Sequence, residues 1–175
     1  MNMGADLEKG YIIMKNFSEL CRENKVLFFL SIANKALQYI KRDEQAKIVK
    51  AALECCWDQM INNNYNGEII YDFLDNEENG ITILAEMSED EKESAAWNCI
   101  IDALAFTSRY AYDARNAKYY PEPISLVDDK LVEHLINCYI KCTSERIYIN
   151  DLLILLSENN QQSIAELKKQ IDSLS

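Results

Sequence analysis

The amino-acid sequence predicts an all-α fold, a single-domain multi-helix bundle with a long central helix at about residues 89–117. Apolar side chains recur three and four residues apart along most of the chain, which is the spacing of an amphipathic helix. Glycine occurs four times and proline twice among 175 residues, so few positions interrupt a helix. The length suits one domain, residues 1–175, and the hydrophobic share of 49% is typical of a folded chain.

Four helical segments are expected in the first half of the chain, at about residues 17–40, 43–63, 68–74 and 81–87. The apolar stripe of the first consists of Val26, Leu30, Ala33, Leu37 and Ile40. The stripe of the second consists of Val49, Ala52, Leu53, Cys56 and Met60. Asparagines and glycines at 62–67 and 79–80 supply the turns that separate these helices. The short apolar run 81–87 favours a helical turn over a strand, because no second strand pattern exists to pair with it.

The expected central helix begins with the clearest local signal in the sequence. Ser88-Glu89-Asp90-Glu91 has the pattern of a capping box, with Ser88 as the N-cap and an acid three residues later. The helix then runs to about Ala117, roughly 42 Å at 1.5 Å per residue. Its apolar arc is wide and rich in alanine, which is typical of a helix in the middle of a bundle.

Three more helical patterns follow the prolines at 121 and 123. One covers about residues 127–142, and the next starts at about residue 145. The last carries the stripe Ile164, Leu167, Ile171 and Leu174. Between the last two patterns, residues 157–162 are expected to kink or separate the helices.

The net charge of −11 limits the classes of partner. A strongly acidic chain repels phosphate backbones, so nucleic acid is not an expected partner. Anionic membrane surfaces are disfavoured for the same reason. A basic protein would instead be attracted and guided to the surface.

The six cysteines lie within apolar helical patterns, which predicts reduced, buried thiols, although their even number leaves disulfides open. Residues 1–10 lack the basic start and apolar run of a signal peptide. No apolar stretch approaches the length of about 18 residues that a membrane span needs. The expected location is the cytoplasm.

The sequence predicts no catalytic, metal-binding or cofactor-binding site. His134 is the only histidine and matches no nucleophile signature, so it is expected to be a solvent-facing or hydrogen-bonded helix residue. Cys138 and Cys142 are four residues apart and could chelate, but packing is favoured because no second ligand pair exists. Glycine-rich phosphate-binding loops are absent.

The segment from Glu68 to Glu93 holds ten acids and one base, so it carries a net charge of −9 while the rest of the chain carries −2. It is either a solvated connector with an acidic helix start, or a docking face for a basic partner. The residues predicted to contact a partner are Glu68, Tyr71, Asp72, Asp75, Glu77, Glu78 and Glu86. A second candidate surface is the tyrosine-rich turn, where capping of the core is favoured over partner binding; its tyrosines are Tyr110, Tyr112, Tyr119 and Tyr120.

Four short motifs resemble a known family. They are Trp97, Asp102-Ala103-Leu104, Ala111-Tyr112 and Tyr120-Pro121-Glu122-Pro123-Ile124. Over about residues 45–130 the chain resembles an all-helical family of bacterial immunity proteins from polymorphic toxin systems, the family usually numbered six. The resemblance implies a cytosolic protein that binds and blocks a toxin delivered by neighbouring cells. It supplies no toxin-contacting residues, so the predicted contact face comes from the charge pattern alone.

The leading hypothesis is therefore an immunity protein, not an enzyme, that covers the active or substrate-binding surface of a cognate toxin. A basic toxin domain, such as a nuclease, would suit an acidic inhibitor. The alternative is a non-enzymatic helical scaffold or regulatory protein that acts through protein–protein contacts and could be a homodimer. A third hypothesis is an enzyme that uses Glu54, Asp58 and Asp102, which requires the fold to bring two such carboxyl groups together.

Overall fold

A computed structural model describes residues 3–159 and 161–174, and every regular element in those ranges is helical. The predicted all-α fold is thus confirmed. In chain order the elements are α1 (Met3–Ser18), α2 (Arg22–Ala36), the 3₁₀ helix η1 (Leu37–Tyr39), α3 (Asp43–Asn62), α4 (Gly67–Leu74), α5 (Ile81–Glu86), α6 (Glu91–Ala114), α7 (Glu122–Ser125), α8 (Leu131–Thr143), α9 (Ile147–Glu158) and α10 (Ile164–Asp172).

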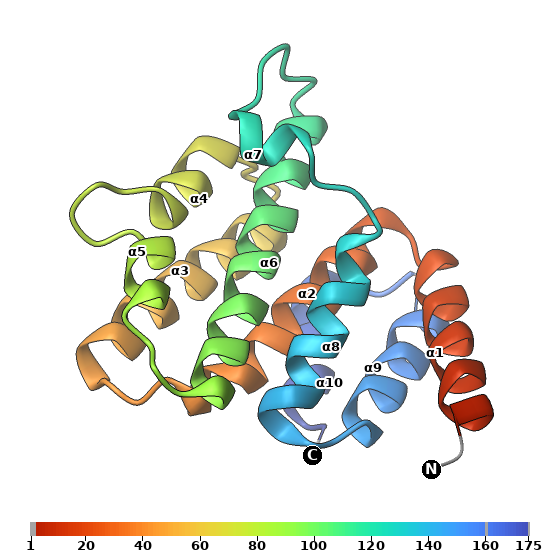
Figure 1. Ribbon diagram of the computed structural model, residues 1–175. Helices are drawn as coiled ribbons and strands as arrows, with labels where there is room; N and C mark the ends of the chain where they lie inside the picture. The colour runs from red at the N-terminus through yellow and green to blue at the C-terminus, as the bar shows by residue number, and fades with distance from the viewer. Residues whose placement is uncertain (1–2, 160, 175) are drawn as a thin grey trace.

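Helix α6 is the predicted central helix, and it lies in the middle of the bundle with α2, α8 and α4 packed along it (Figure 1). Its alanines explain the position, because Ala96, Ala103 and Ala111 are buried and let the neighbouring helices approach closely. Larger side chains fill the remaining space: the ring of Phe106 stacks on that of Phe29 from α2, with 4.1 Å between centroids. The helix is shorter at both ends than the predicted span of 89–117.

The predicted capping box at Ser88 is wrong, because Asp90 is the N-cap of α6. The carboxylate of Asp90 accepts a hydrogen bond from the backbone N–H of Glu93 at 2.9 Å and pairs with Lys41 at 3.1 Å. Glu93 turns inward and accepts hydrogen bonds from the backbone N–H of Lys41 and the hydroxyl of Ser88. The contact with Lys41, in the connection between α2 and α3, therefore favours Asp90 over Ser88 as the N-cap. This contact is between residues distant in the chain, so the residues at the start of the helix do not predict it.

The first predicted helix, 17–40, covers the last two residues of α1, all of α2 and the 3₁₀ helix η1, and the sequence did not predict the rest of α1. Helix α1 ends at Ser18, and α2 begins at Arg22 after Cys21 adopts an extended conformation with ψ 162°. The apolar stripe continues across the break because Phe17 packs edge-on against Phe28 and Phe29 of α2. Helix α2 buries residues on all sides, which makes it the second internal helix of the bundle.

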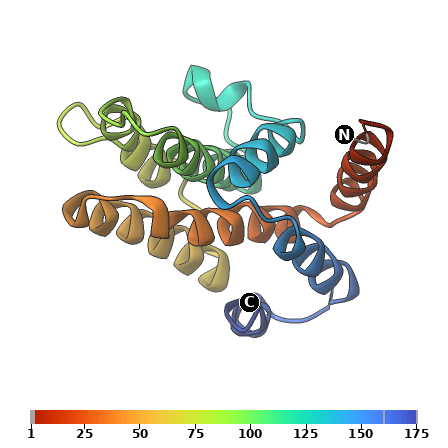
Figure 2. The same ribbon diagram turned by 60° about the horizontal axis from the view of Figure 1, so that its bottom comes forward.

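Helices α3, α4 and α5 agree closely with the segments expected from the sequence. Asn63 ends α3 in the left-handed conformation, with φ 52°. The side chain of Asn66 then caps α4 by accepting a hydrogen bond from the N–H of Ile69. Helices α4 and α5 and their connection form one side of the bundle, and α1 and α9 lie on the opposite side (Figures 1 and 2).

The C-terminal helices are shifted or missed in places. Helix α8 begins at Leu131 rather than at 127, because Asp128–Lys130 form a turn, and the short helix α7 was not predicted. A capping box does occur at the start of α10, where Ser163 and Glu166 satisfy each other's backbone N–H groups. The predicted break at 157–162 begins two residues too early, because α9 continues to Glu158; the helices are separated from residue 159 on, and residue 160 is outside the described residues.

The prediction of six buried cysteines is partly wrong. Four are buried, but Cys55 is half-buried and Cys21 is exposed in the α1–α2 turn. All six are free thiols. Within residues 3–159 and 161–174, no helix combines the length and the apolar character that crossing a membrane would require.

Candidate functional site

The structure brings the predicted contact residues to one side of the bundle. Helix α4 carries three of them, its connection to α5 carries three, and the end of α5 carries the last. The side chain of Tyr71 is half-buried, and the six acids are all exposed. We call these six residues the acidic face: Glu68, Asp72, Asp75, Glu77, Glu78 and Glu86.

In the part of the chain that the structure describes, the carboxylates of the acidic face have no cationic partners. No Lys, Arg or His nitrogen of the described residues lies within 4.0 Å of any of the six. Some acids elsewhere do have such partners, since Asp113 pairs with Arg22 and Asp129 pairs with Lys25, each at 2.6 Å. The negative charge of the acidic face is therefore available to an external cation.

Tyr71 connects this face to the core. Its hydroxyl donates a hydrogen bond to Asp75 at 2.7 Å, four residues further along the chain. The hydrogen bond to Asp75, with burial as a second cause, raises the pKa of Tyr71 to about 12, so the phenol stays protonated at neutral pH. The contact orders the C-terminal end of α4.

Exposed apolar side chains lie among the acids, and sequence reasoning missed them. Ile69 follows Glu68 and is 49% exposed, whereas Ile83 and Met87 beside Glu86 are 40% and 54% exposed. Buried Ile70 and Leu74 define the packed side of α4, and Ile69 lies off that side. Protein interfaces combine apolar centres with polar rims, so this mixture suits a contact surface.

The tyrosine-rich turn adjoins the N-terminal end of α4. The hydroxyl of Ser108 donates to the carbonyl oxygen of Gly67 at 2.8 Å. A Cβ atom on Gly67 would lie 2.7 Å from Cγ of Tyr112, so α4 and α6 are in close contact there. Tyr110 is buried, Tyr112 and Tyr120 are half-buried, and Tyr119 is 87% exposed. Three of the four tyrosines thus cover the core, and Tyr119 does not.

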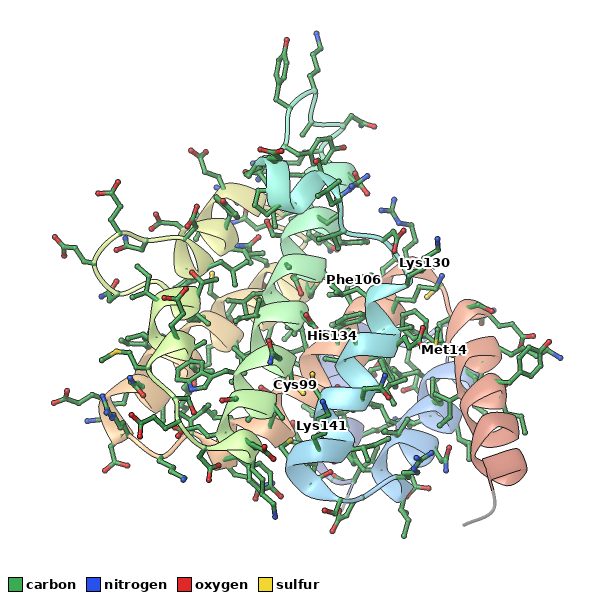
Figure 3. The ribbon with its side chains drawn as sticks, in the orientation of Figure 1. Met14, Cys99, Phe106, Lys130, His134 and Lys141 are labelled. Atoms are coloured by element: carbon green, nitrogen blue, oxygen red, sulfur yellow. The ribbon has the colours of Figure 1, made fainter. Side chains whose placement is uncertain are left out.

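A separate polar cluster joins α6 to α8, where His134 lies on the side of α8 that is visible in Figure 3. The Nδ1 atom of His134 is 2.7 Å from a carboxylate oxygen of Asp102, and its Nε2 atom is 3.6 Å from Sγ of Cys138. A hollow of about 560 Å³ lies beside His134 and Cys138. The expectation of an exposed or hydrogen-bonded His134 is confirmed, since the side chain is both.

Asp102, His134 and Cys138 lie in the order of a catalytic carboxylate, its histidine base and a cysteine nucleophile. The thiol of Cys138, however, is not activated. Burial, with the charge of Asp102 as a second cause, raises the pKa of Cys138 to about 11, so the sulfur stays protonated at neutral pH. Burial also raises the pKa of Asp102 to about 6, although the hydrogen bond from His134 acts in the opposite direction. We interpret the cluster as a polar contact between helices.

The carboxyl groups of the enzyme hypothesis do not form one site. Glu54 and Asp58 are exposed on α3, where Glu54 lies 3.8 Å from Lys50. Asp102 is buried on α6 and contacts His134. Among the described residues, no group of three or more His, Cys, Asp and Glu side chains has an arrangement suited to a metal ion.

The fold and these surfaces define an all-α protein with a strongly acidic, unpaired face on one side of the bundle. The family model described as Immunity protein Imm6 matches residues 24–142, which is more than half of the chain. The chain belongs to this immunity protein family, as the resemblance in its sequence predicted. The match runs from α2 to α8 and includes the whole acidic face. Searches of curated proteins and of solved structures gave no significant match.

Proposed function

We propose that this protein binds a cognate bacterial toxin and neutralises it by covering the toxin's active or substrate-binding surface. The choice of contact face is supported by its six exposed carboxylates, which have no cationic partner within the described residues. Membership of an immunity protein family supports a toxin as the partner. Inhibition by binding needs no catalytic group of this protein's own.

The toxin that fits this face is basic, and a nuclease is the class that we favour. The substrate-binding surface of a nuclease must attract phosphate groups, and its lysines and arginines would equally attract a dense group of carboxylates. Charges that attract one another over a distance chiefly raise the association rate, by about 10- to 1000-fold at low salt. Rapid capture suits a protein that must reach a toxin before the toxin reaches its substrate.

The first test is co-expression with the toxin domain that the adjacent upstream gene encodes. The domain should arrest growth when it is expressed alone, and growth should recover when this protein is present. A domain that is harmless alone, or that kills despite this protein, contradicts the proposed function.

The second test reverses three charges of the acidic face: Asp72→Lys, Glu77→Lys and Glu78→Lys. Asp75 is left intact because it accepts the hydrogen bond from Tyr71. We expect the association rate with the toxin domain, measured by stopped flow at low salt, to fall by about 10-fold or more. The dependence of this rate on salt should weaken at the same time.

The matched control reverses three exposed acids on the opposite side of the bundle: Glu145→Lys, Asp151→Lys and Glu158→Lys. Both triple variants change the net charge by the same amount, so net charge alone cannot separate them. The acidic face is the contact surface only if its variant associates much more slowly than the control. Equal association rates, with both folds intact by circular dichroism, would exclude it.

A further inference from the structure

The connection from α6 to α7 and the end of α7 present two large, highly exposed apolar side chains. Tyr119 is 87% exposed and Leu126 is 78% exposed. The connection stands away from the body of the bundle in Figure 1. We call residues 116–127 the anchor loop. Side chains as exposed as these contribute little to the stability of the bundle and are accessible to a partner.

The anchor loop is held in one conformation by Arg109 of α6. The Nη1 atom of Arg109 donates to the carbonyl oxygens of Ile124, Ser125 and Val127, at 3.4, 2.8 and 3.4 Å. Its guanidinium group also lies over the ring of Tyr120, 4.7 Å from the centroid. One side chain thus fixes the loop at several points.

Asp113 strengthens this attachment from the other side. Its carboxylate accepts hydrogen bonds from the hydroxyl of Tyr120 at 2.7 Å and from Arg22 at 2.6 Å, and it pairs with Arg109 at 3.1 Å. Pro121 and Pro123 limit the backbone of the same segment. A loop ordered in advance loses little conformational entropy when a partner binds, which favours affinity.

The anchor loop adjoins the acidic face. The rings of Tyr112 and Tyr120 are 5.6 Å apart, and Tyr112 packs against Gly67 at the start of α4. Glu68 and Ile69 follow Gly67 directly and are exposed. A partner bound to α4 therefore has the anchor loop at the edge of its contact area.

We propose that the anchor loop is the apolar half of the toxin-binding surface, and that Tyr119 and Leu126 insert into an apolar hollow beside the basic patch of the toxin. This inference rests on the proposed function. Tyrosine is enriched among the residues that dominate binding energy, because it buries a large area and has few rotatable bonds. The acidic face then governs the rate of encounter, and the anchor loop governs the lifetime of the complex.

The two halves of the surface can be separated kinetically with the toxin domain from the adjacent upstream gene as the probe. We expect Tyr119→Ala and Leu126→Ala each to increase the dissociation rate by roughly 10- to 100-fold. The association rate and its salt dependence should stay close to those of the unchanged protein. The charge-reversal variant of the acidic face should show the opposite division, with a slower association and a smaller effect on dissociation.

The controls are a tyrosine and an aliphatic residue of similar exposure on two helices outside the anchor loop. Tyr11→Ala on α1 and Ile147→Ala on α9 remove side chains that are 71% and 74% exposed. The complexes of these two variants with the toxin domain should dissociate at the rate of the unchanged protein. All four side chains are exposed, so melting temperatures should be alike, and this is checked by circular dichroism.

Two results would overturn the inference, and they differ in what they leave standing. If the unchanged protein binds and the anchor-loop variants dissociate at its rate, the loop is not part of the contact surface and the proposed function survives. If the unchanged protein does not bind the toxin domain at all, the proposed function and the inference both fail.

Discussion

Asp102 is a buried acid in the core, since its side chain is 8% exposed and, among the described residues, its carboxylate contacts only the imidazole of His134. Burial raises its pKa to about 6, against 3.8 for a free side chain. Between about pH 4 and pH 6 the folded protein therefore holds a proton that the unfolded chain has released. The free energy of unfolding must fall as the pH rises through this window, and the carboxylate costs about 3 kcal/mol above it.

We predict that Asp102→Asn removes this dependence, because the amide has a similar shape and carries no charge. Relative to the unchanged protein, the variant should gain up to about 3 kcal/mol in unfolding free energy between pH 4 and pH 7. Urea denaturation across that range measures the difference. Asp58→Asn is the control, since Asp58 is exposed and should show no such trend. A constant difference between Asp102→Asn and the unchanged protein would show that the buried carboxyl does not titrate in this window.

At the scale of the helix, α4 can pack close to α6 because Gly67 has no side chain. A Cβ atom there would overlap the ring of Tyr112, and the neighbouring carbonyl is fixed by the hydroxyl of Ser108. We predict that Gly67→Ala lowers the unfolding free energy by about 1–3 kcal/mol, the usual cost of overpacking. Urea denaturation at neutral pH measures this loss.

The matched control is Gly10→Ala in α1, where a Cβ atom would have no heavy atom within 4 Å. Alanine there should raise the unfolding free energy by about 0.5–1 kcal/mol, because glycine is the weaker helix former. The two substitutions are chemically identical and should act in opposite directions. A Gly67→Ala protein as stable as the unchanged one would mean that α4 can move away from α6 without loss.

Helices whose ends depend on local signals are the ones that the sequence predicts well. Asn63 and Asn66 end α3 and start α4 through their own conformation and side chain, so both boundaries are visible in the sequence. The start of α6 depends instead on Lys41, which is distant in the chain and pairs with Asp90. The division of residues 17–40 has the same origin, because Phe17 packs on α2 and continues the apolar pattern across a turn.

The candidate site shows the same limit. Charge density predicts a surface segment, and the acids of 68–86 are exposed as expected from their type. The exposure of Ile69, Ile83 and Met87 could not be predicted, because apolar periodicity in so short a helix does not reveal which side packs. The contact between Asp102 and His134 depends on how α6 packs against α8, so the sequence does not reveal it. The contact between His134 and Cys138 could be predicted, because the two residues are four apart on one helix.

On the scale of the whole molecule, the charge is asymmetric. The segment from Glu68 to Glu93 carries −9 and the rest of the chain carries −2. Neighbouring carboxylates without cationic partners repel one another in the free protein, and this repulsion opposes folding. A basic partner would relieve it. The placement of charge therefore implies a protein that is less stable alone than its core would allow.

This trade-off can be tested by neutralising the acidic face with Asp72→Asn, Glu77→Gln and Glu78→Gln. The melting temperature of the free protein at low salt should rise while its association with the toxin domain slows, because one set of charges causes both effects. At about 1 M salt the Debye length is near 3 Å, so the gain in melting temperature should disappear. Neutralising the acids at 145, 151 and 158 changes the net charge equally but should raise the melting temperature less, since those acids lie in the part of the chain that carries only −2. An equal rise in both variants would mean that total charge, and not its concentration between α4 and α5, limits the stability of the free protein.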